Sequence, residues 1–188
     1  NTWRSRMTGQ INVNKLAARS GNTITINSGD KISGDAGSII APGSAIQIVH
    51  HKWNDLTTST STSYADVTSS SLTFTPKLAS SKLLIQTSCA TSINRAAGAA
   101  YGNIVVVHDG STVDNPSDNY ESGISATGAT AINLYHRIHK SVSVDAGNTN
   151  SRVIKLQLRV YDTANGGQIR VNVNSLFYSS IDVTEIAQ

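Results

Sequence analysis

The stretch that decides the fold is residues 41–92, which read APGSAIQIVHHKWNDLTTSTSTSYADVTSSSLTFTPKLASSKLLIQTSCATS. Short runs of β-branched and apolar residues alternate there with clusters of Ser, Thr, Pro and Gly. Runs of this length, bounded by turn-forming residues, are typical of strands in an all-β sandwich or barrel. Pro76 ends one of the runs, because proline has no N–H to donate to a ladder. The stretch therefore predicts an all-β fold.

The same pattern continues to the end of the chain. Period-two alternation is clear at residues 154–160, where every second residue is Ile, Leu or Val. Such alternation places one face of a strand on a core and the other on solvent or a polar interface. We expect an antiparallel two-sheet sandwich of the jelly-roll type, whose longer strands can each break into two. The expected strands are Ala45–Lys52, Tyr64–Val67, Ser71–Thr75, Lys82–Ser92, Ala100–His108, Ala129–Val144, Ser151–Asp162 and Gln168–Ile186.

Residues 1–40 are organised differently. They hold three short alternating pieces, Gln10–Asn14, Asn22–Asn27 and Lys31–Ser33, separated by Gly-containing turns. Each piece has only one narrow apolar face, which is too little to bury as an isolated strand set. Wrapped around two further copies, the pieces could form a core. We therefore expect residues 1–40 to be an arm or a trimeric stem, and residues 41–188 to be the globular head.

Composition limits the function classes. Charged residues make up 14% of the 188-residue chain, against about 25% in typical proteins. The net charge is +3, and the Lys and Arg residues are scattered instead of forming a phosphate-binding cluster. No apolar run is long enough to span a membrane, and no apolar core follows the N-terminal arginines as in a secretory signal. We expect neither nucleic-acid binding nor membrane insertion.

No cofactor site is expected from the cysteine and the histidines. Cys89 lies within an apolar strand and is expected to be a small buried side chain. Neighbouring His50 and His51 point to opposite faces of a strand, as do His136 and His139, so neither pair can hold one metal ion. An axial metal with one histidine from each copy of a trimer is the alternative to ordinary surface or interface histidines.

Nothing in the sequence has the spacing of an enzyme active site. Asp109, Asp114, Asp118 and Glu121 fall in one loop without the spacing of an EF-hand, so they form either a solvated loop with Asx turns or a calcium or glycan site. A nucleophile elbow and a phosphate-binding loop are both missing. Tyrosines could stack on sugar rings if the fold groups them, and the sequence does not say whether it does. These are Tyr101, Tyr120, Tyr135, Tyr161 and Tyr178.

The head also carries a resemblance to a known family. The order is a PGS start at residues 42–44, a Ser/Thr tract, Tyr64-Ala-Asp-Val, Ser71-Leu-Thr-Phe-Thr-Pro and Ser80-Ser-Lys-Leu-Leu-Ile. This order resembles the C-terminal β-domain of small fibre proteins of tailed bacteriophages, especially those of marine and cyanobacterial phages. The segments at residues 11–16, 23–32 and 183–188 are similar to the same family.

The resemblance implies a non-enzymatic virion protein: a homotrimeric tail or virion fibre on the outside of the particle, whose head touches a host-surface glycan or protein. The arm would bind other virion proteins, with Trp3, Arg4 and Arg6 as anchors, because Trp and Arg are enriched at interface hot spots. The alternative for these three residues is a frayed terminus. The head loops would make the contacts with the host or with other subunits, through Arg95, Tyr101, Asp114, Asp118 and Tyr120.

Two other functions stay open. Forty residues make almost no shaft, so a capsid decoration or cement protein, or a neck or baseplate component, is the first alternative. The second is a carbohydrate-binding module. Copy number separates the first alternative from a fibre, since a shell carries hundreds of copies and a tail or vertex carries few. Glycan binding by the head tests the second.

Overall fold

The computed structural model describes residues 40–95, 100–114, 122–124, 132–161, 167–173 and 177–188. The chain divides into two units, residues 1–39 and 40–188, and the description below concerns the second. Every regular element in the described residues is a strand. The strands are β1 (Ala45–Trp53), β2 (Thr57–Ser59), β3 (Ala65–Asp66), β4 (Leu72–Phe74), β5 (Lys82–Arg95), β6 (Ala100–His108), β7 (Ser111–Thr112), β8 (Ser122–Ile124), β9 (Ile132–Asp145), β10 (Arg152–Val160), β11 (Gln168–Val171) and β12 (Ser179–Ile186).

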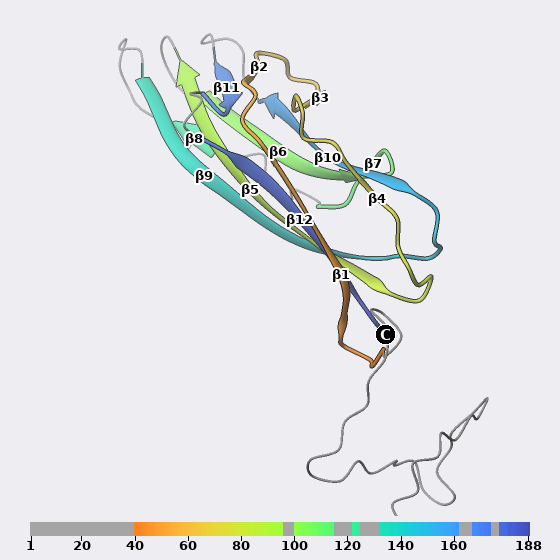
Figure 1. Ribbon diagram of the computed structural model, residues 1–188. Helices are drawn as coiled ribbons and strands as arrows, with labels where there is room; N and C mark the ends of the chain where they lie inside the picture. The colour runs from red at the N-terminus through yellow and green to blue at the C-terminus, as the bar shows by residue number, and fades with distance from the viewer. Residues whose placement is uncertain (1–39, 96–99, 115–121, 125–131, 162–166, 174–176) are drawn as a thin grey trace, which may run out of the picture. The chain divides into compact units, whose positions relative to one another are not determined.

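The strands form two antiparallel sheets that pack face to face (Figure 1). Sheet A runs β9–β5–β12–β1, with β11 and β2 continuing the β12 and β1 positions toward one end. Sheet B has β10 and β6 at its centre, with β3 and β4 beside β10 and with β7 and β8 beside β6. The all-β prediction is therefore confirmed, and so is its arrangement in two antiparallel sheets.

Strand β5 is the centre of sheet A. One edge pairs with β9 over its whole length, from Lys82↔Asp145 to Arg95↔Ile132. The other edge pairs first with β12 and then, from Thr91 onward, with β11. Both edges of β5 are thus occupied, so its amides and carbonyls are hydrogen-bonded on both sides as a buried strand requires.

The core lies between the sheets and is built from alternate residues of each strand. On β10 the predicted alternation is confirmed, because the apolar side chains at 154, 156, 158 and 160 are fully buried and the polar ones between them are only half-buried. Sheet A contributes the matching layer. The facing core side chains are Leu83, Ile85, Ile181 and Val183 from sheet A and Ile104, Val106, Ile154 and Leu156 from sheet B.

The observed bounds agree with the predicted strands most closely at Ala100–His108, which is β6. Strand β5 runs three residues further than expected, to Arg95, which therefore ends a strand instead of opening a loop. The Ser/Thr tract that indicated a turn contains the short strand β2, because Thr57 and Ser59 are buried and pair with β11. Asp109 and Gly110 both have positive φ, at 49° and 80°, and form the tight turn between β6 and β7.

The predicted strand Gln168–Ile186 breaks in two at Asn172. This residue has φ of 54°, and its buried side chain bonds to the end of β1, to the β1–β2 connection and to the start of β12. Its amide nitrogen donates to the carbonyl oxygens of Trp53 (3.3 Å) and Asp55 (3.4 Å), and its oxygen accepts from the hydroxyl of Ser179 (2.7 Å). Asn tolerates the left-handed region better than other non-Gly residues, which suits it to this break.

Glu185 on β12 is a buried carboxylate that ties three segments together. It accepts hydrogen bonds from the backbone N–H groups of Lys77 and Leu78 (2.9 and 2.8 Å), from the Ser81 hydroxyl (2.7 Å) and from Gln47 Nε2 on β1 (2.6 Å). Burial by itself raises the pKa of Glu185, but these hydrogen bonds outweigh it, so the pKa lies below its usual value. The carboxylate thereby fixes the β4–β5 connection against sheet A.

Gly102 on β6 packs directly against Ile169 on β11, so the two sheets approach each other closely there. A Cβ at this position would lie 2.7 Å from Cδ1 and 3.1 Å from Cβ of Ile169 on β11. Ile169 is fully buried, so its side chain has no solvent into which it can move. A side chain at residue 102 would therefore force the sheets apart, and glycine is required there for packing and not for its backbone angles.

We predict that Gly102→Ala lowers the free energy of unfolding by about 1–3 kcal/mol, because it overpacks the core. Urea unfolding followed by circular dichroism measures the change. Ile169→Val removes the Cδ1 atom that the new methyl meets. The double variant should therefore lose less free energy of unfolding than the two single variants lose together. Strict additivity would contradict this account.

We predict that Glu185→Gln lowers the free energy of unfolding by about 2 kcal/mol at neutral pH, because an amide NH₂ would face donors that now meet a carboxylate. The folded-state pKa lies below the unfolded value of about 4.5, so this stabilisation is complete above that pH and is lost as the pH falls toward the folded-state pKa. The wild-type chain should therefore lose stability below about pH 4.5 more steeply than the variant. Asp145→Asn, which removes a carboxylate whose side chain is 79% exposed, is the control.

Candidate functional site

The outward side of sheet A carries several large exposed apolar or aromatic side chains. We call it the outer A face and define it by the side chains that alternate with the core residues of four strands. They are Ile48, His50 and Lys52 on β1, Ser180, Asp182 and Thr184 on β12, Leu84, Gln86, Ser88, Ala90 and Ser92 on β5, and Tyr135, Arg137, His139 and Ser141 on β9. Small and uncharged side chains fill its centre.

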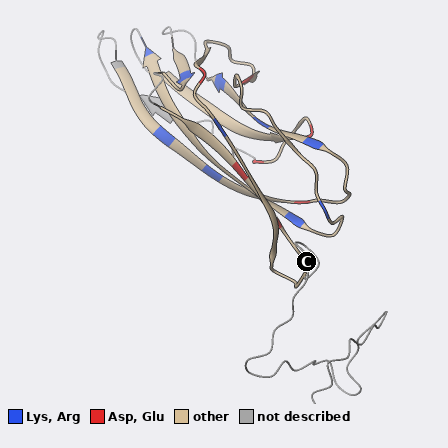
Figure 2. Cartoon of the chain, viewed as in Figure 1, with Lys and Arg blue, Asp and Glu red and all other residues tan. Residues whose placement is uncertain are grey.

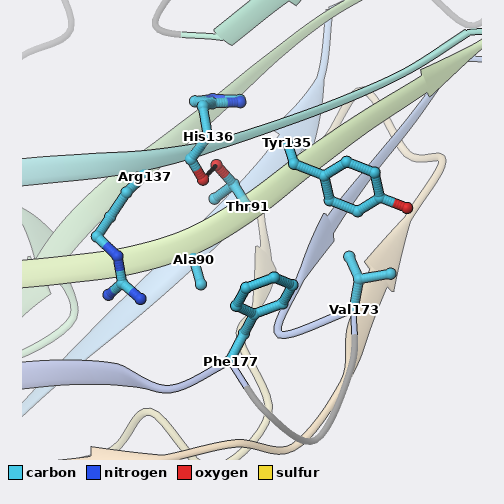
Figure 3. A pocket seen from close by; sticks show the side chains of 7 residues that line it. All are labelled: Ala90, Thr91, Tyr135, His136, Arg137, Val173 and Phe177. Carbon is cyan, nitrogen blue, oxygen red and sulfur yellow. Dashed lines mark hydrogen bonds between the residues drawn. The ribbon is translucent and has the colours of Figure 1, made fainter.

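An aromatic hollow lies on this face, beside the segment between β11 and β12 (Figure 3). Its volume is about 310 Å³. The Tyr135 and Phe177 rings both border it (Figure 3). Tyr135 is 54% exposed and Phe177 is 40% exposed, which is unusual for such large side chains. The complete lining is Ala90, Thr91, Tyr135, His136, Arg137, Val173 and Phe177.

Arg137 positions the rim of the hollow. One of its guanidinium nitrogens donates to the hydroxyl of Ser88 (2.8 Å) and to the carbonyl oxygen of Tyr178 (3.0 Å). The Lys52 ammonium lies 3.8 Å from the centre of the Tyr178 ring, a cation–π contact. These contacts join β9, β5 and β1 to the start of β12, so they fix the positions of the strands that carry the aromatic side chains.

Charges on the outer A face are few and partly neutralised. His50 Nδ1 lies 2.6 Å from a carboxylate oxygen of Asp182. Figure 2 shows that Lys, Arg, Asp and Glu occur singly along the strands of the head. Interface cores are depleted of charged residues and enriched in aromatic residues and Arg. The hollow and its surroundings have this composition, so they suit a contact with another macromolecular surface.

The structure separates the residues that the sequence indicated as contact sites. Arg95 is buried (1% exposed), and its Nε and one Nη have no hydrogen-bond partner. Tyr101 is half-buried on the outward side of β6. Trp3, Arg4, Arg6, Asp118 and Tyr120 lie outside the described residues. Arg95 offers almost no surface to a partner, whereas Tyr101 is only half-buried.

Asp114 is held by a buried ion pair. Its carboxylate accepts a hydrogen bond from the backbone N–H of Val106 and a second one from the ammonium of Lys140. The Asp114 and Lys140 side chains are 12% and 8% exposed. The pair links the end of the β6–β7 hairpin in sheet B to edge strand β9 in sheet A. Asp114 therefore joins the two sheets, and only a small part of it can reach a ligand.

The tyrosines divide between the two sheets. Tyr135 and Tyr178 lie on the outer A face, and both are exposed. Tyr101 and Tyr161 lie on the outward side of sheet B, where the Tyr161 N–H donates to the Tyr101 carbonyl oxygen (2.9 Å). Alternation alone could not group them, because strands that are distant in sequence become neighbours only through pairing.

The described residues contain no group of three or more His, Cys, Asp or Glu side chains that could hold a metal ion. His50 and His51 lie on opposite faces as expected, since His50 contacts Asp182 and His51 Nε2 lies 2.7 Å from the carbonyl oxygen of Ser69. Burial lowers the pKa of His136, and burial together with the Arg152 charge lowers that of His108. Both imidazoles are thus biased toward the neutral form at neutral pH.

Sequence reasoning missed the residues of the hollow except Tyr135 and His136. Ala90, Val173 and Phe177 come together because β11, which precedes Val173, and β12, which follows Phe177, both pair with β5. The one available signal was the adjacent pair Phe177 and Tyr178 just before a strand. Two aromatic neighbours point to opposite sides of an extended chain, so at least one of them had to face outward or fill a gap.

Comparisons with known proteins add little. No protein-family model and no curated protein matches the chain. Among solved structures, the chain is similar to dimeric latent PorU from Porphyromonas gingivalis, with 8% identity and a TM-score of 0.36. The match covers 82% of this chain and 14% of that one. No helix in the described residues is long and apolar enough to cross a membrane.

We predict that Cys89 is unreactive in the folded protein. It is fully buried, and burial raises the pKa of its thiol to about 12. Thiolate is the reactive form, so a disulfide reagent such as DTNB should modify the native chain no faster than the chain unfolds. In denaturant one thiol per chain should react at once, which calibrates the assay. Rapid labelling of native protein would contradict the structure.

Proposed function

We propose that the chain is a non-enzymatic virion protein of a tailed bacteriophage: a homotrimeric fibre whose jelly-roll head is displayed for attachment to the host surface. The observation that carries the assembly is the aromatic hollow on the outer A face. The virion assignment is supported by the sequence resemblance of residues 41–92 to phage fibre heads. The arm, residues 1–40, would anchor the head to other virion proteins.

The strand pairing supports a jelly roll. The pairs β1–β12, β4–β10, β5–β9 and β6–β7 are nested, each lying inside the previous one along the chain, and they alternate between sheet A and sheet B. One long antiparallel hairpin folded across itself would give this nesting and this alternation. The topology therefore favours a rolled hairpin over two independently formed sheets.

The outer A face supports self-association. Large exposed apolar side chains lie on it: Ile48 is 66% exposed near one end, and Tyr135, Phe177 and Tyr178 are 40% to 54% exposed near the other. A face of this kind is covered in a working protein more often than it is left in water. Three copies that turn this face toward a common axis would bury it and leave sheet B outward. Such closed symmetry is also the usual outcome for identical chains.

The two ends of the head support an outward display. The Gly43 N–H donates to the Ala187 carbonyl oxygen (2.8 Å), and the Ala187 N–H donates to that of Ser44 (2.9 Å). The chain thus enters and leaves the head at one end. Strand β5 begins beside this end, at Lys82 opposite Ile186, and reaches the opposite end of the head at Arg95. The end that follows the arm would face the particle, and the opposite end would face the host.

The place of the protein on the particle can be tested by cryo-electron microscopy of intact virions. We expect trimeric density of the size of this head at the tail or at the vertices, in few copies. Hundreds of copies spread over the shell would instead make it a decoration or cement protein. Its absence from purified virions would overturn the proposal.

We predict that Tyr135→Glu converts the trimer to monomers, because it puts a charge into the hollow that another copy would cover. Sedimentation velocity over a range of micromolar concentrations measures the mass of the full chain. Tyr161→Glu is the matched control, since Tyr161 is similarly exposed (46% against 54%) but lies on sheet B, and it should remain trimeric. A monomeric wild-type chain, or a trimer that survives Tyr135→Glu, would refute this use of the face.

A further inference from the structure

A second hollow lies on the outer A face, next to the aromatic one. Arg137 borders both of them. Cross-strand pairing places Lys52 beside Ser180 and Ser180 beside Ser88, so small hydroxyl side chains lie between the two edge strands that carry Lys52 and Arg137. We call this space, which has a volume of about 320 Å³, the cationic hollow. Its lining is His50, Lys52, Arg137, Tyr178, Ser179 and Ser180.

Tyr178 holds both cations of this hollow in place. The Lys52 ammonium lies 3.8 Å from the centre of the Tyr178 ring. The Tyr178 carbonyl oxygen accepts a hydrogen bond from Arg137 (3.0 Å), and the same guanidinium nitrogen donates to the Ser88 hydroxyl (2.8 Å). The described residues accept from no other nitrogen of this guanidinium. Arg137 therefore keeps N–H donors that a ligand can use.

Neither cation has a carboxylate partner among the described residues. The ion pairs in the described part of the chain join other residues: His50 with Asp182, Lys82 with Asp145, Lys140 with Asp114 and Lys155 with Asp66. Asp182 is the only carboxylate among the side chains that define the outer A face, and His50 contacts it. Lys52 and Arg137 thus place two like charges around one hollow, and an anion between them would offset their repulsion.

The proposed trimer would make this imbalance of charge more costly. On an exposed surface, water solvates a cation. Copies that turn the outer A face toward a common axis would remove water from Lys52 and Arg137. A charge that leaves water costs free energy unless an opposite charge accompanies it. Each copy would bring the same two cations to the interface, so the assembly needs a source of negative charge there.

We propose that the cationic hollow binds an inorganic oxyanion, phosphate or sulfate, which the trimer encloses between its copies. Such an anion presents several acceptor oxygens, which match the Lys52 ammonium, the unused N–H groups of Arg137 and the Ser180 hydroxyl. The planar guanidinium suits two oxygens of one oxyanion, and the ammonium acts as a point charge beside it. This inference rests on the proposed trimer and adds a ligand to its interface.

The test follows thermal unfolding and sedimentation velocity of the full chain during titration with phosphate or with sulfate. Sodium chloride holds the ionic strength constant, because screening alone changes the repulsion. Both anions also stabilise proteins in general by exclusion from the surface, so the readout is the saturable part of the response. We expect at least one anion to raise the Tm by about 3–6 °C at about ten times its dissociation constant. It should also lower the concentration at which the trimer dissociates.

Lys52→Gln should lose the saturable rise in Tm and the effect on dissociation. Lys82→Gln is the matched control, since it removes the same charge from the same sheet at a residue that is paired with Asp145 outside the hollow, and it should respond as the wild type does. Equal responses of the wild type and Lys52→Gln to both anions would overturn the proposal. If the chain is then a trimer, only the anion site is refuted. A monomer whose Tm responds through Lys52 instead refutes the assembly and leaves the anion site standing.

Discussion

The structure of the head depends on hydrogen-bonded strand pairing along both edges of β5, which β9, β12 and β11 supply. A central strand of fourteen residues has a row of backbone N–H and C=O groups along each edge, and each of these groups needs a hydrogen-bond partner. β9 satisfies one edge completely. The other edge needs two partners, β12 and β11, because Asn172 breaks the returning strand. The aromatic hollow lies at this break, where the returning chain leaves β5 and rejoins it.

Much of this head could be read from the alternation of apolar residues, since period two both identifies a strand and selects its buried face. It succeeded on β10, where polar and apolar residues strictly alternate. The alternation could not identify which face of β6 packs on the core, because its residues from Ile104 to Val107 are all apolar and all buried. Strand β2 was hidden for a different reason: Thr and Ser are turn formers by composition, and only pairing with β11 makes them a strand.

Sites were harder to predict than strands, because a site is a product of pairing between distant segments. Ala90, Tyr135 and Phe177 are each ordinary in sequence and meet only through the β5–β9 register and the return of the chain into β12. Arg95 and Asp114 were predicted as surface contacts because they flank loops. Burial of Arg95, and the ion pair between Asp114 and Lys140, depend on the opposite sheet, which no local pattern describes.

The pairing of β1 with β12 has a mechanical consequence. The chain enters the head at Ala45, opposite Ile186, and β1 then runs antiparallel to β12 as far as the Trp53↔Ser179 pair. A pull on the entering chain, directed away from the head, acts along the axis of β1. It loads all the hydrogen bonds of this ladder in shear at the same time, instead of opening them one after another. A head tethered through residue 40 is thus built to withstand tension along its tether.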